Sequence, residues 1–158
     1  MNKKINAIIK TSKPHQRVGE LSNAHVGDSF EQTALSFFEK KGMCLSRNFP
    51  LEIGFLSKKR HRFDLGSAGS KIIIECKSHR WTEGDKVPSA KMTTWNEAML
   101  YFHLAPKDFK KVFFALHDKR KTTQESLVSY YRRTYPHLIP EDVEFIEFDE
   151  LTGAIIYE

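Results

Sequence analysis

The segment that most restricts the fold of this chain is a run of apolar residues ending in charges, Lys71-Ile72-Ile73-Ile74-Glu75-Cys76-Lys77. Consecutive isoleucines favour a β-strand, because β-branched side chains pack well on a pleated sheet. A strand with one face in water would alternate apolar and polar residues, so three isoleucines in a row predict a strand buried on both faces. We therefore expect a central strand in which the charged residues lie at the end.

A second strand, residues 60–66, precedes this one. A two-residue turn at Gly69-Ser70 would join the two strands into a hairpin, because glycine suits the first central position. The register of the hairpin then determines which residues face each other. The expected cross-strand pairs are Leu65 with Ile74, Asp64 with Glu75, and Arg62 with Lys77.

This register separates the side chains by type, because residues alternate between the two faces of a strand. Asp64, Glu75 and Lys77 share one face. The other face carries apolar residues, and only Ile73 departs from the pattern; these residues are Phe63, Leu65, Ile72, Ile74 and Cys76.

The two facing carboxylates predict a cation between them. Cross-strand neighbours lie about 4.5–5.5 Å apart at Cβ, so Asp64 and Glu75 repel each other unless a positive charge intervenes. Mg²⁺ suits such a pair, since it takes one or two carboxylates together with waters and a substrate phosphate. Lys77 lies about 6.6 Å further along the same face, within reach of a phosphate or an attacking water. The alternative is an ordinary surface hairpin, although that would not need the preceding isoleucines.

The remaining pattern predicts an α/β fold with one domain. We expect helices at residues 26–41, where Gly42 would end the helix, and at 89–105 before Pro106. A third helix would begin at the capping-box pair Thr122 and Glu125 and end before Pro136. The expected strands are residues 48–55, 60–66, 71–77, 112–116 and 143–148, with 154–157 as a further candidate. Such an order favours a mixed central sheet with helices on both faces.

Composition limits the class of protein. The chain has 158 residues and a net charge of +5, and its two cysteines fit no disulfide framework or zinc site, which indicates a reducing, cytoplasmic setting. No apolar run is long enough to predict a membrane span. Residues 1–24 are expected to form a basic arm and residues 25–158 a single domain. Basic clusters suit a polyanion, but ordinary solvated surface remains equally open.

The motifs together resemble the PD-(D/E)xK nuclease superfamily, which has the restriction-endonuclease-like fold. An Asp followed by a turn and a hydrophobic strand ending in Glu-x-Lys is its signature, although Phe63 stands where the signature has Pro. Gly27-x-x-Phe30-Glu31-x-x-Ala34 is similar to the first helix of that family. Glu97-x-x-x-Tyr101 is similar to the Gln-x-x-x-Tyr element of its RecB-like members, with Glu in place of Gln. The likeness extends over roughly residues 25 to 148.

The resemblance implies a role for each matching residue. Asp64, Glu75 and the backbone carbonyl of Cys76 would bind Mg²⁺, with Mn²⁺ as a substitute. Lys77 would orient the nucleophilic water. Glu31 would be a further catalytic or metal-binding carboxylate, although the dipole at a helix N-terminus explains such a residue equally well. Glu97 and Tyr101 are weaker candidates, and an ordinary surface position is favoured for Glu97.

DNA is the expected partner. Arg60 and Arg62 on the strand at residues 60–66, and Lys59 just before it, are candidates for phosphate contacts. The loop after Lys77 adds His79, Arg80 and Lys86, together with Trp81, which would either stack on a base or pack beneath the loop.

The leading functional hypothesis is an endonuclease that hydrolyses DNA phosphodiester bonds with Mg²⁺. Within that class the pattern is also similar to Holliday-junction resolvases and to compact restriction or homing enzymes. The resemblance implies a homodimer or higher homo-oligomer, because two strands must be cut. The alternative from another class is a DNA-binding module without turnover.

Overall fold

The computed structural model of the chain describes residues 23–157, which form one α/β domain around a six-stranded sheet. The expected arm, residues 1–24, lies outside the described residues except for its last two, which begin the first helix. The elements are α1 (Asn23–Lys40), β1 (Ser46–Ile53), β2 (Lys59–Ser67), β3 (Ile72–Lys77), α2 (Ser89–Leu104), β4 (Lys110–Leu116), α3 (Leu127–Thr134), the 3-10 helix η1 (Pro136–Leu138), β5 (Val143–Phe148) and β6 (Ile155–Tyr157). The predicted order of helices and strands is therefore confirmed.

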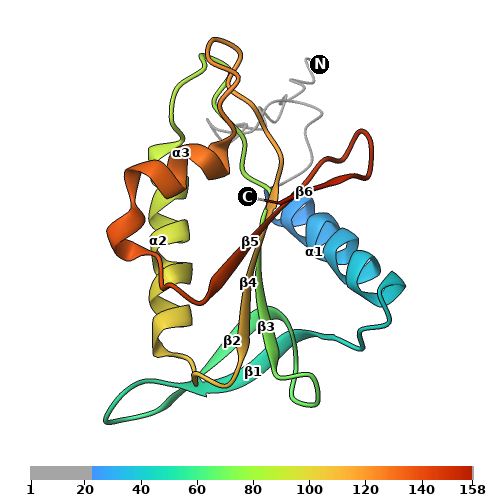
Figure 1. Cartoon of the computed structure of the whole chain (residues 1–158), viewed down its shortest axis with the longest axis vertical. Coiled ribbons are helices and arrows are strands. Elements are labelled where there is room, and N and C mark those ends of the chain that lie inside the picture. Colours follow the sequence, from blue (N-terminus) through green and yellow to red (C-terminus); the bar gives the residue numbers. More distant parts are fainter. Residues whose placement is uncertain (1–22, 158) are drawn as a thin grey trace, which may run out of the picture.

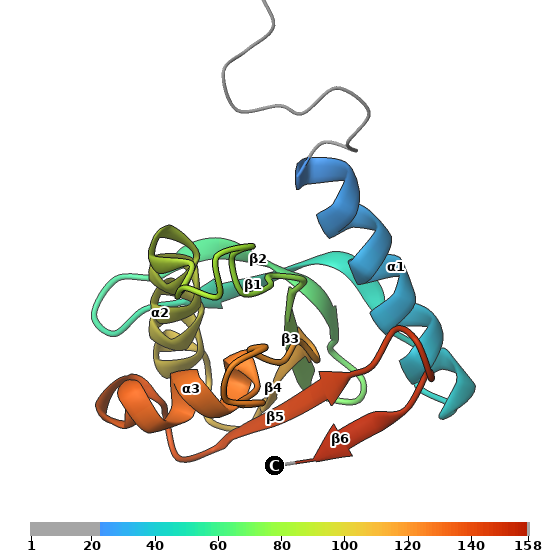
Figure 2. The ribbon, with the colours of Figure 1, turned by 90° about the horizontal axis from the view of Figure 1, so that it is seen from above.

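The sheet is mixed, as predicted, and its strands follow one another in sequence order. β1, β2 and β3 are antiparallel neighbours, while β3, β4 and β5 run parallel. β6 returns antiparallel to β5 at the edge. The helices lie on both faces, with α1 on one side of the sheet and α2 and α3 on the other (Figures 1 and 2).

Helix α1 ends where the sequence predicted. Gly42 has φ +79°, a left-handed conformation that glycine adopts without steric cost. The N–H groups of Gly42 and Met43 donate to the carbonyls of Glu39 at 2.8 Å and Phe38 at 3.1 Å, which is the Schellman arrangement. Phe30, Ala34 and Phe38, spaced four residues apart on this helix, are buried against the sheet.

The hairpin between β2 and β3 has the predicted register but a different turn. Leu65 pairs with Ile74 and Ser67 with Ile72. The connection is a four-residue loop in which Lys71, with φ +47°, is left-handed and Gly69 is not. A two-residue turn at 69–70 and a four-residue loop at 68–71 are centred on the same point, so both give the same strand pairing.

The two strands separate beyond Leu65, and this corrects two expectations. Asp64 is not paired with Glu75, because its Oδ2 atom instead accepts the backbone N–H of Cys76 at 2.7 Å. Arg62 lies opposite Pro50 of β1 rather than opposite Lys77. From this point β2 follows β1 rather than β3.

Phe63 is therefore on the other side of the sheet from its expected neighbours. It packs with the residues under α2, whereas Leu65, Ile74 and Cys76 pack under α1. Asn48, which lies between paired residues of β1 beside this point, has φ +50°. Simple alternation fails here because it assumes that β2 stays on one ladder.

Helix α3 begins later than predicted. Its N-cap is Ser126, whose hydroxyl accepts the backbone N–H of Ser129 at 3.0 Å. Thr122 has another role, because its N–H and hydroxyl both donate to Asp85, at 2.9 and 2.6 Å. This contact joins the loop after β3 to the loop after β4.

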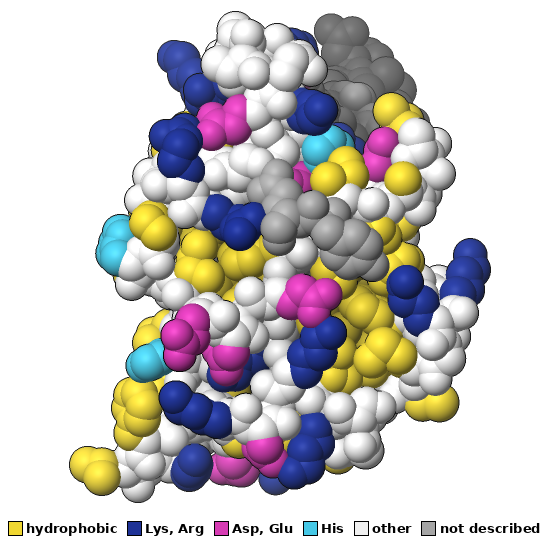
Figure 3. All heavy atoms as spheres, viewed as in Figure 1, with side chains coloured by type: hydrophobic (Ala, Val, Ile, Leu, Met, Phe, Trp, Pro, Cys, Tyr) yellow, Lys and Arg dark blue, Asp and Glu magenta, His cyan; other side chains and the backbone are white. Residues whose placement is uncertain are grey.

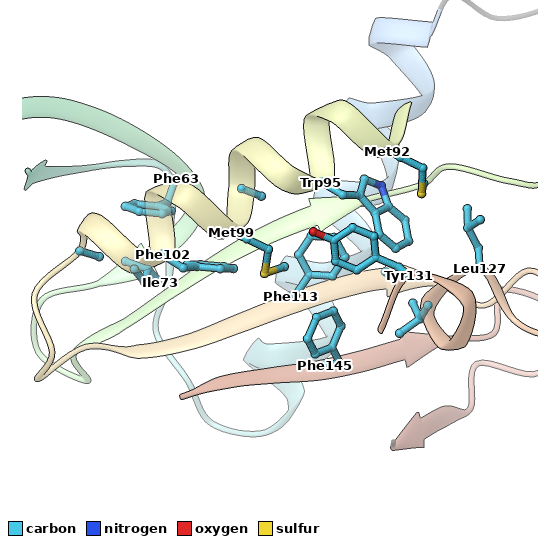
Figure 4. Packing of buried hydrophobic residues seen from close by; sticks show 14 of the residues in the cluster. Phe63, Ile73, Met92, Trp95, Met99, Phe102, Phe113, Leu127, Tyr131 and Phe145 are labelled. Carbon is cyan, nitrogen blue, oxygen red and sulfur yellow. The ribbon is translucent and has the colours of Figure 1, made fainter. Parts of the chain in front are cut away.

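Two hydrophobic clusters fill the space on either side of the sheet. The α1-side core contains Phe30, Ala34, Phe38, Leu65, Ile72, Ile74, Cys76, Val112, Phe114, Leu116 and Ile146. The α2-side core is larger and rich in aromatic residues, which include Phe63, Trp95, Phe102, Phe113, Tyr131 and Phe145 (Figure 4). β3 contributes to both clusters, as expected for a strand buried on both faces. Among the described residues, no helix combines the length and apolar character needed to cross a membrane.

Candidate active site

Three charged side chains meet where β3 ends. The Nζ atom of Lys77 lies 2.8 Å from Oε2 of Glu75 and 3.8 Å from Oδ2 of Asp64. All three side chains are largely buried, with exposed fractions of 16%, 7% and 24% for Lys77, Glu75 and Asp64. The sequence therefore predicted correctly which charged residues come together, although the register it gave for Asp64 and Glu75 does not form.

Asp64 is held at the position where β2 leaves β3. Its carboxylate takes the place of a backbone carbonyl as the acceptor for the Cys76 N–H. Burial raises the pKa of Asp64 to about 6, and the charge of Glu75 acts in the same direction. Lys77 and the Cys76 N–H oppose these effects. Asp64 is thus a carboxylate whose ionised form gains from any additional cation nearby.

Glu75 lies deeper and is held from two sides. Burial acts to raise its pKa, but a hydrogen bond from His61 and the charge of Lys77 outweigh it, so the pKa of Glu75 is lowered. His61 Nε2 lies 3.5 Å from Oε1, at the long end of hydrogen bonding. These contacts keep Glu75 ionised in an otherwise apolar setting.

His61 is a site residue that the sequence analysis missed. It stands in a basic run, where a histidine suggests ordinary surface, but its ring is stacked on Tyr101 at 3.9 Å. It also packs edge-on against Phe63 at 4.7 Å. Strand alternation was the available signal, because His61 is two residues before the buried Phe63 and so faces the same side.

Glu97 and Tyr101 lie beyond His61. Tyr101 donates its hydroxyl to Oε1 of Glu97 at 2.6 Å. Tyr101 contacts the site through His61, whereas Glu97 is exposed and contacts neither Asp64 nor Glu75. Glu97 is therefore a surface residue, which was the favoured expectation.

Glu31 reaches the site from α1. It lines a cavity together with Asp64, and its charge contributes to the raised pKa of Asp64. Oε2 of Glu31 accepts a hydrogen bond from Arg47 at 2.7 Å, and the same guanidinium binds Asp28 at 2.5 Å. Glu31 is therefore near the two carboxylates but already has a cationic partner.

The cavity beside these residues has a volume of about 540 Å³. It lies between the first half of α1, the ends of β2 and β3, and the beginning of α2. Its lining residues are Val26, Gly27, Glu31, Asp64, Cys76, Lys77, Ser78, His79, Arg80, Pro88, Lys91 and Thr94. A volume of this size matches a site for a small ligand or for one or two nucleotide units.

The loop residues proposed to bind DNA differ in their accessibility. His79 and Arg80 both line the cavity, but Arg80 also forms ion pairs with Asp118 at 3.3 Å and Glu150 at 2.8 Å. Trp81 is only 8% exposed and lies under the guanidinium of Arg120, 4.0 Å from its ring centre. Of the two expected roles of Trp81, its burial therefore favours packing beneath the loop over stacking on a base.

The other basic candidates lie on the surface. Lys59, Arg60, Arg62 and Lys86 are exposed, and Arg60 is 3.6 Å from Glu52 in an ion pair. Figure 3 shows further Lys and Arg side chains around the top of the molecule, where the loops after β3 and β4 lie.

The donor atoms at the site fit a hard divalent cation. Within residues 23–157, no three His, Cys, Asp or Glu side chains form a metal-binding cluster. Mg²⁺ does not require one, since it is commonly bound through one or two carboxylates with waters and a phosphate, whereas structural zinc takes four N or S ligands. Burial raises the pKa of the Cys76 thiol well above its usual value, so Cys76 would contribute only its carbonyl oxygen.

Comparisons of the chain with known protein families, with curated proteins and with solved structures find no match. The site is therefore interpreted from its own geometry. That geometry is a buried pair of carboxylates, one of them with a raised pKa, bridged by an ammonium group at the wall of a cavity.

Proposed function

We propose that this chain is a metal-dependent deoxyribonuclease of the PD-(D/E)xK superfamily, which hydrolyses phosphodiester bonds in the cavity beside Asp64. The observation that carries the proposal is the convergence of Asp64, Glu75 and Lys77. The Nζ atom of Lys77 lies 2.8 Å from Glu75 and 3.8 Å from Asp64. The element order and the mixed sheet support the restriction-endonuclease-like fold that such an enzyme would have.

Asp64 and Glu75 would hold Mg²⁺, or Mn²⁺ in its place, with the Cys76 carbonyl and Glu31 as further oxygen donors. The metal ion would supply Lewis-acid stabilisation of the phosphoryl oxygens. Lys77 remains an ammonium in this arrangement. Burial acts to lower its pKa, but the charges of Glu75 and Asp64 outweigh burial and raise it. Lys77 is therefore suited to donate hydrogen bonds to a phosphate oxygen or to the attacking water rather than to accept a proton.

Nucleic acid is the substrate class that the surface charge supports. The net charge is +5, and exposed basic residues extend along β2 and the loop after β3. Phosphates bound there would release counterions and add affinity without base specificity. A homodimer or higher homo-oligomer would bring two such sites to the two strands of a duplex or a four-way junction.

A DNA-binding module without turnover is the second candidate. The observation that favours it is Lys77 itself, which already neutralises much of the charge of the carboxylate pair. The two candidates differ in one measurable respect, because only a nuclease requires a divalent cation to cut its ligand.

The test is incubation of the purified chain with supercoiled plasmid, linear duplex, a four-way junction and a single strand, with Mg²⁺, Mn²⁺ or EDTA. Cleavage is expected only when Mg²⁺ or Mn²⁺ is present and not in EDTA. Preference for the junction would indicate a resolvase. Glu75→Ala is expected to reduce cleavage by at least about 10³-fold while DNA binding remains. Glu144→Ala is the matched control, since Glu144 pairs with Lys110 on β4. Full activity of Glu75→Ala would overturn the proposal.

A further inference from the structure

The cavity beside Asp64 has two chemically different walls. Glu31 and Asp64 provide acidic groups from α1 and β2. The part of the lining from the end of β3 and the beginning of α2 carries Lys77, His79 and Lys91. Lys77 is engaged with the carboxylates, but within the described part of the chain Lys91 forms no ion pair. His79 and Lys91 are thus available to a ligand that accepts hydrogen bonds.

The tautomer of His79 follows from its partner. The indole N–H of Trp95 donates to Nδ1 of His79 at 2.8 Å. An indole nitrogen is only a donor, so Nδ1 carries no proton and the single proton of the neutral ring is on Nε2. Nε2 is the one ring nitrogen left to contact a ligand.

Trp95 is a rigid support for this arrangement. It is 0% exposed, and its ring packs edge-on against Phe113 at 4.9 Å and Tyr131 at 5.1 Å. Figure 4 shows Trp95 on α2 between the helix and the sheet, with its nitrogen directed away from the packed rings. The core of the domain therefore fixes which atom of His79 serves the cavity.

His79 also remains neutral near physiological pH. Burial lowers the pKa of His79 to about 4, and the positive charges of Lys91 on α2 and Lys77 on β3 act in the same direction. The ring would become cationic only below that pH. Its contribution to an anionic ligand is consequently a directed hydrogen bond rather than a charge.

We propose that His79 Nε2–H and the Lys91 ammonium form a second phosphate subsite, beside the position of the scissile phosphate. Its ligand would be a neighbouring phosphodiester or a terminal phosphate of the same nucleic-acid strand. Both groups on this wall are donors, which suits the non-bridging oxygens of a phosphate and disfavours a cationic ligand. Naming the ligand a nucleic-acid phosphate rests on the proposed nuclease function, whereas the anion site itself does not.

The test measures binding of a short fluorescent single strand to the intact chain in EDTA, so that cleavage plays no part. His79→Ala and Lys91→Ala are each expected to weaken binding about tenfold, as for the loss of one charge-assisted contact. His79→Gln keeps an N–H donor and is expected to bind within about threefold of wild type. Lys40→Ala, on the far part of α1, is the matched control for loss of one positive charge.

The salt dependence of binding separates the two residues. Lys91→Ala should reduce the slope of log K against log [salt] by about 0.7, the value for one phosphate contact on a single strand. His79→Ala should leave the slope unchanged between pH 6 and pH 8, because the wild-type ring carries no charge there. A slope change equal to that of Lys91→Ala would overturn the neutral-donor role of His79.

The outcome for the subsite is distinguishable from that for the nuclease. Wild-type affinity in both His79→Ala and Lys91→Ala would overturn the subsite even if the chain cuts DNA. Weakened binding in both variants, with no cleavage under any metal ion, would retain the subsite as an anion site and overturn the nuclease. Retained binding in His79→Gln would show that the weaker binding of His79→Ala comes from the missing N–H donor rather than from a loss of the fold.

Discussion

The two sides of the sheet support the site in different ways. The α1-side core consists of apolar side chains alone, packed around Phe114. The α2-side core contains aromatic residues that also carry polar atoms, and these atoms form specific hydrogen bonds. Trp95 donates to His79 and Tyr131 donates to Asn96, at 2.8 and 2.9 Å. The α1-side core therefore supports the strands by apolar packing, whereas the α2-side core also orients polar groups through hydrogen bonds.

This difference has consequences for substitution. A cavity in an apolar core lowers the free energy of unfolding but leaves neighbouring rigid elements in place. Removal of one polar atom on the α2 side costs less stability, yet it releases a residue at the site from its fixed orientation. Stability and function are thus expected to separate between the two sides of the sheet.

The largest expected effect on stability is that of Phe114→Ala. Phe114 is 0% exposed and lies 5.5–5.7 Å from the rings of Phe30, Phe37 and Phe38. Its truncation should lower the free energy of unfolding by about 3–5 kcal/mol, measured by urea denaturation. The smaller change Phe114→Leu should leave DNA cleavage within about twofold of wild type. A larger loss of cleavage in folded Phe114→Leu would show that the α1 side also orients the site, through Glu31.

Asp64→Asn is expected to stabilise the metal-free protein while it abolishes cleavage. The folded pKa of Asp64 is about 6, above its ordinary value of 3.8, so the folded state holds this proton more tightly than the unfolded state. Wild-type stability should therefore decrease as pH rises from about 4 to about 6 and stay lower above that range.

Asparagine can still accept the Cys76 N–H, and it removes the charge. We expect Asp64→Asn to gain roughly 1–2 kcal/mol at pH 8 in EDTA, measured by thermal or urea unfolding, with less gain at pH 4. An equal change in stability at both pH values would contradict the raised pKa. Asp28→Asn, on the exposed start of α1, is the comparison with the opposite sign. A hydrogen bond from Arg47 lowers the pKa of Asp28, so the loss of this carboxylate should not stabilise the protein.

The pairing of β2 with β3 between Leu65 and Ile72 was predictable because turn position and side-chain alternation constrain it together. Glycine and serine at 69–70 located the centre of the hairpin, and the isoleucines of β3 required burial on both faces. The identity of Asp64, Glu75 and Lys77 followed from that pairing. It did not depend on the turn type, which differs from the expectation.

The errors arise where a side chain replaces a backbone contact. Asp64 accepts the Cys76 N–H, so β2 separates from β3 at this point and Phe63 packs on the α2 side of the sheet. Ser126, rather than Thr122, caps α3, because Thr122 is engaged with Asp85 from a distant loop. Local patterns do not contain such long-range hydrogen bonds. For His61 alternation with Phe63 gave the buried side, but its stacking on Tyr101 from another element has no local signal.

His61→Phe tests whether the α2 side orients Glu75. Phenylalanine keeps the stacking on Tyr101 but removes the contact between Nε2 and Glu75. Burial acts to raise the pKa of Glu75, and without the hydrogen bond from His61 only Lys77 offsets that effect. The pKa of Glu75 should therefore rise. We expect about a tenfold loss of cleavage, with the acid limb of the pH–rate profile shifted to higher pH and stability within about 1 kcal/mol of wild type.

The matched control is His103→Phe. His103 lies on α2 and packs edge-on against Phe55 at 5.6 Å, away from the carboxylates. Its replacement should leave the pH–rate profile unchanged. If the His61 and His103 variants behave alike, polar support from the α2 side is not what holds Glu75.

The smallest effect is expected for Glu97→Gln, at the outer end of the contacts that lead through Tyr101 and His61 to Glu75. Glutamine can still accept the Tyr101 hydroxyl, so stability should change by no more than about 0.5 kcal/mol and cleavage by less than about twofold. The hydrogen bond to Glu97 raises the pKa of Tyr101, with burial acting in the same direction, so an ultraviolet titration should show that pKa falling toward 10. A cleavage loss above about tenfold would instead place Glu97 in the active site, and the polar support on the α2 side would then extend to the protein surface.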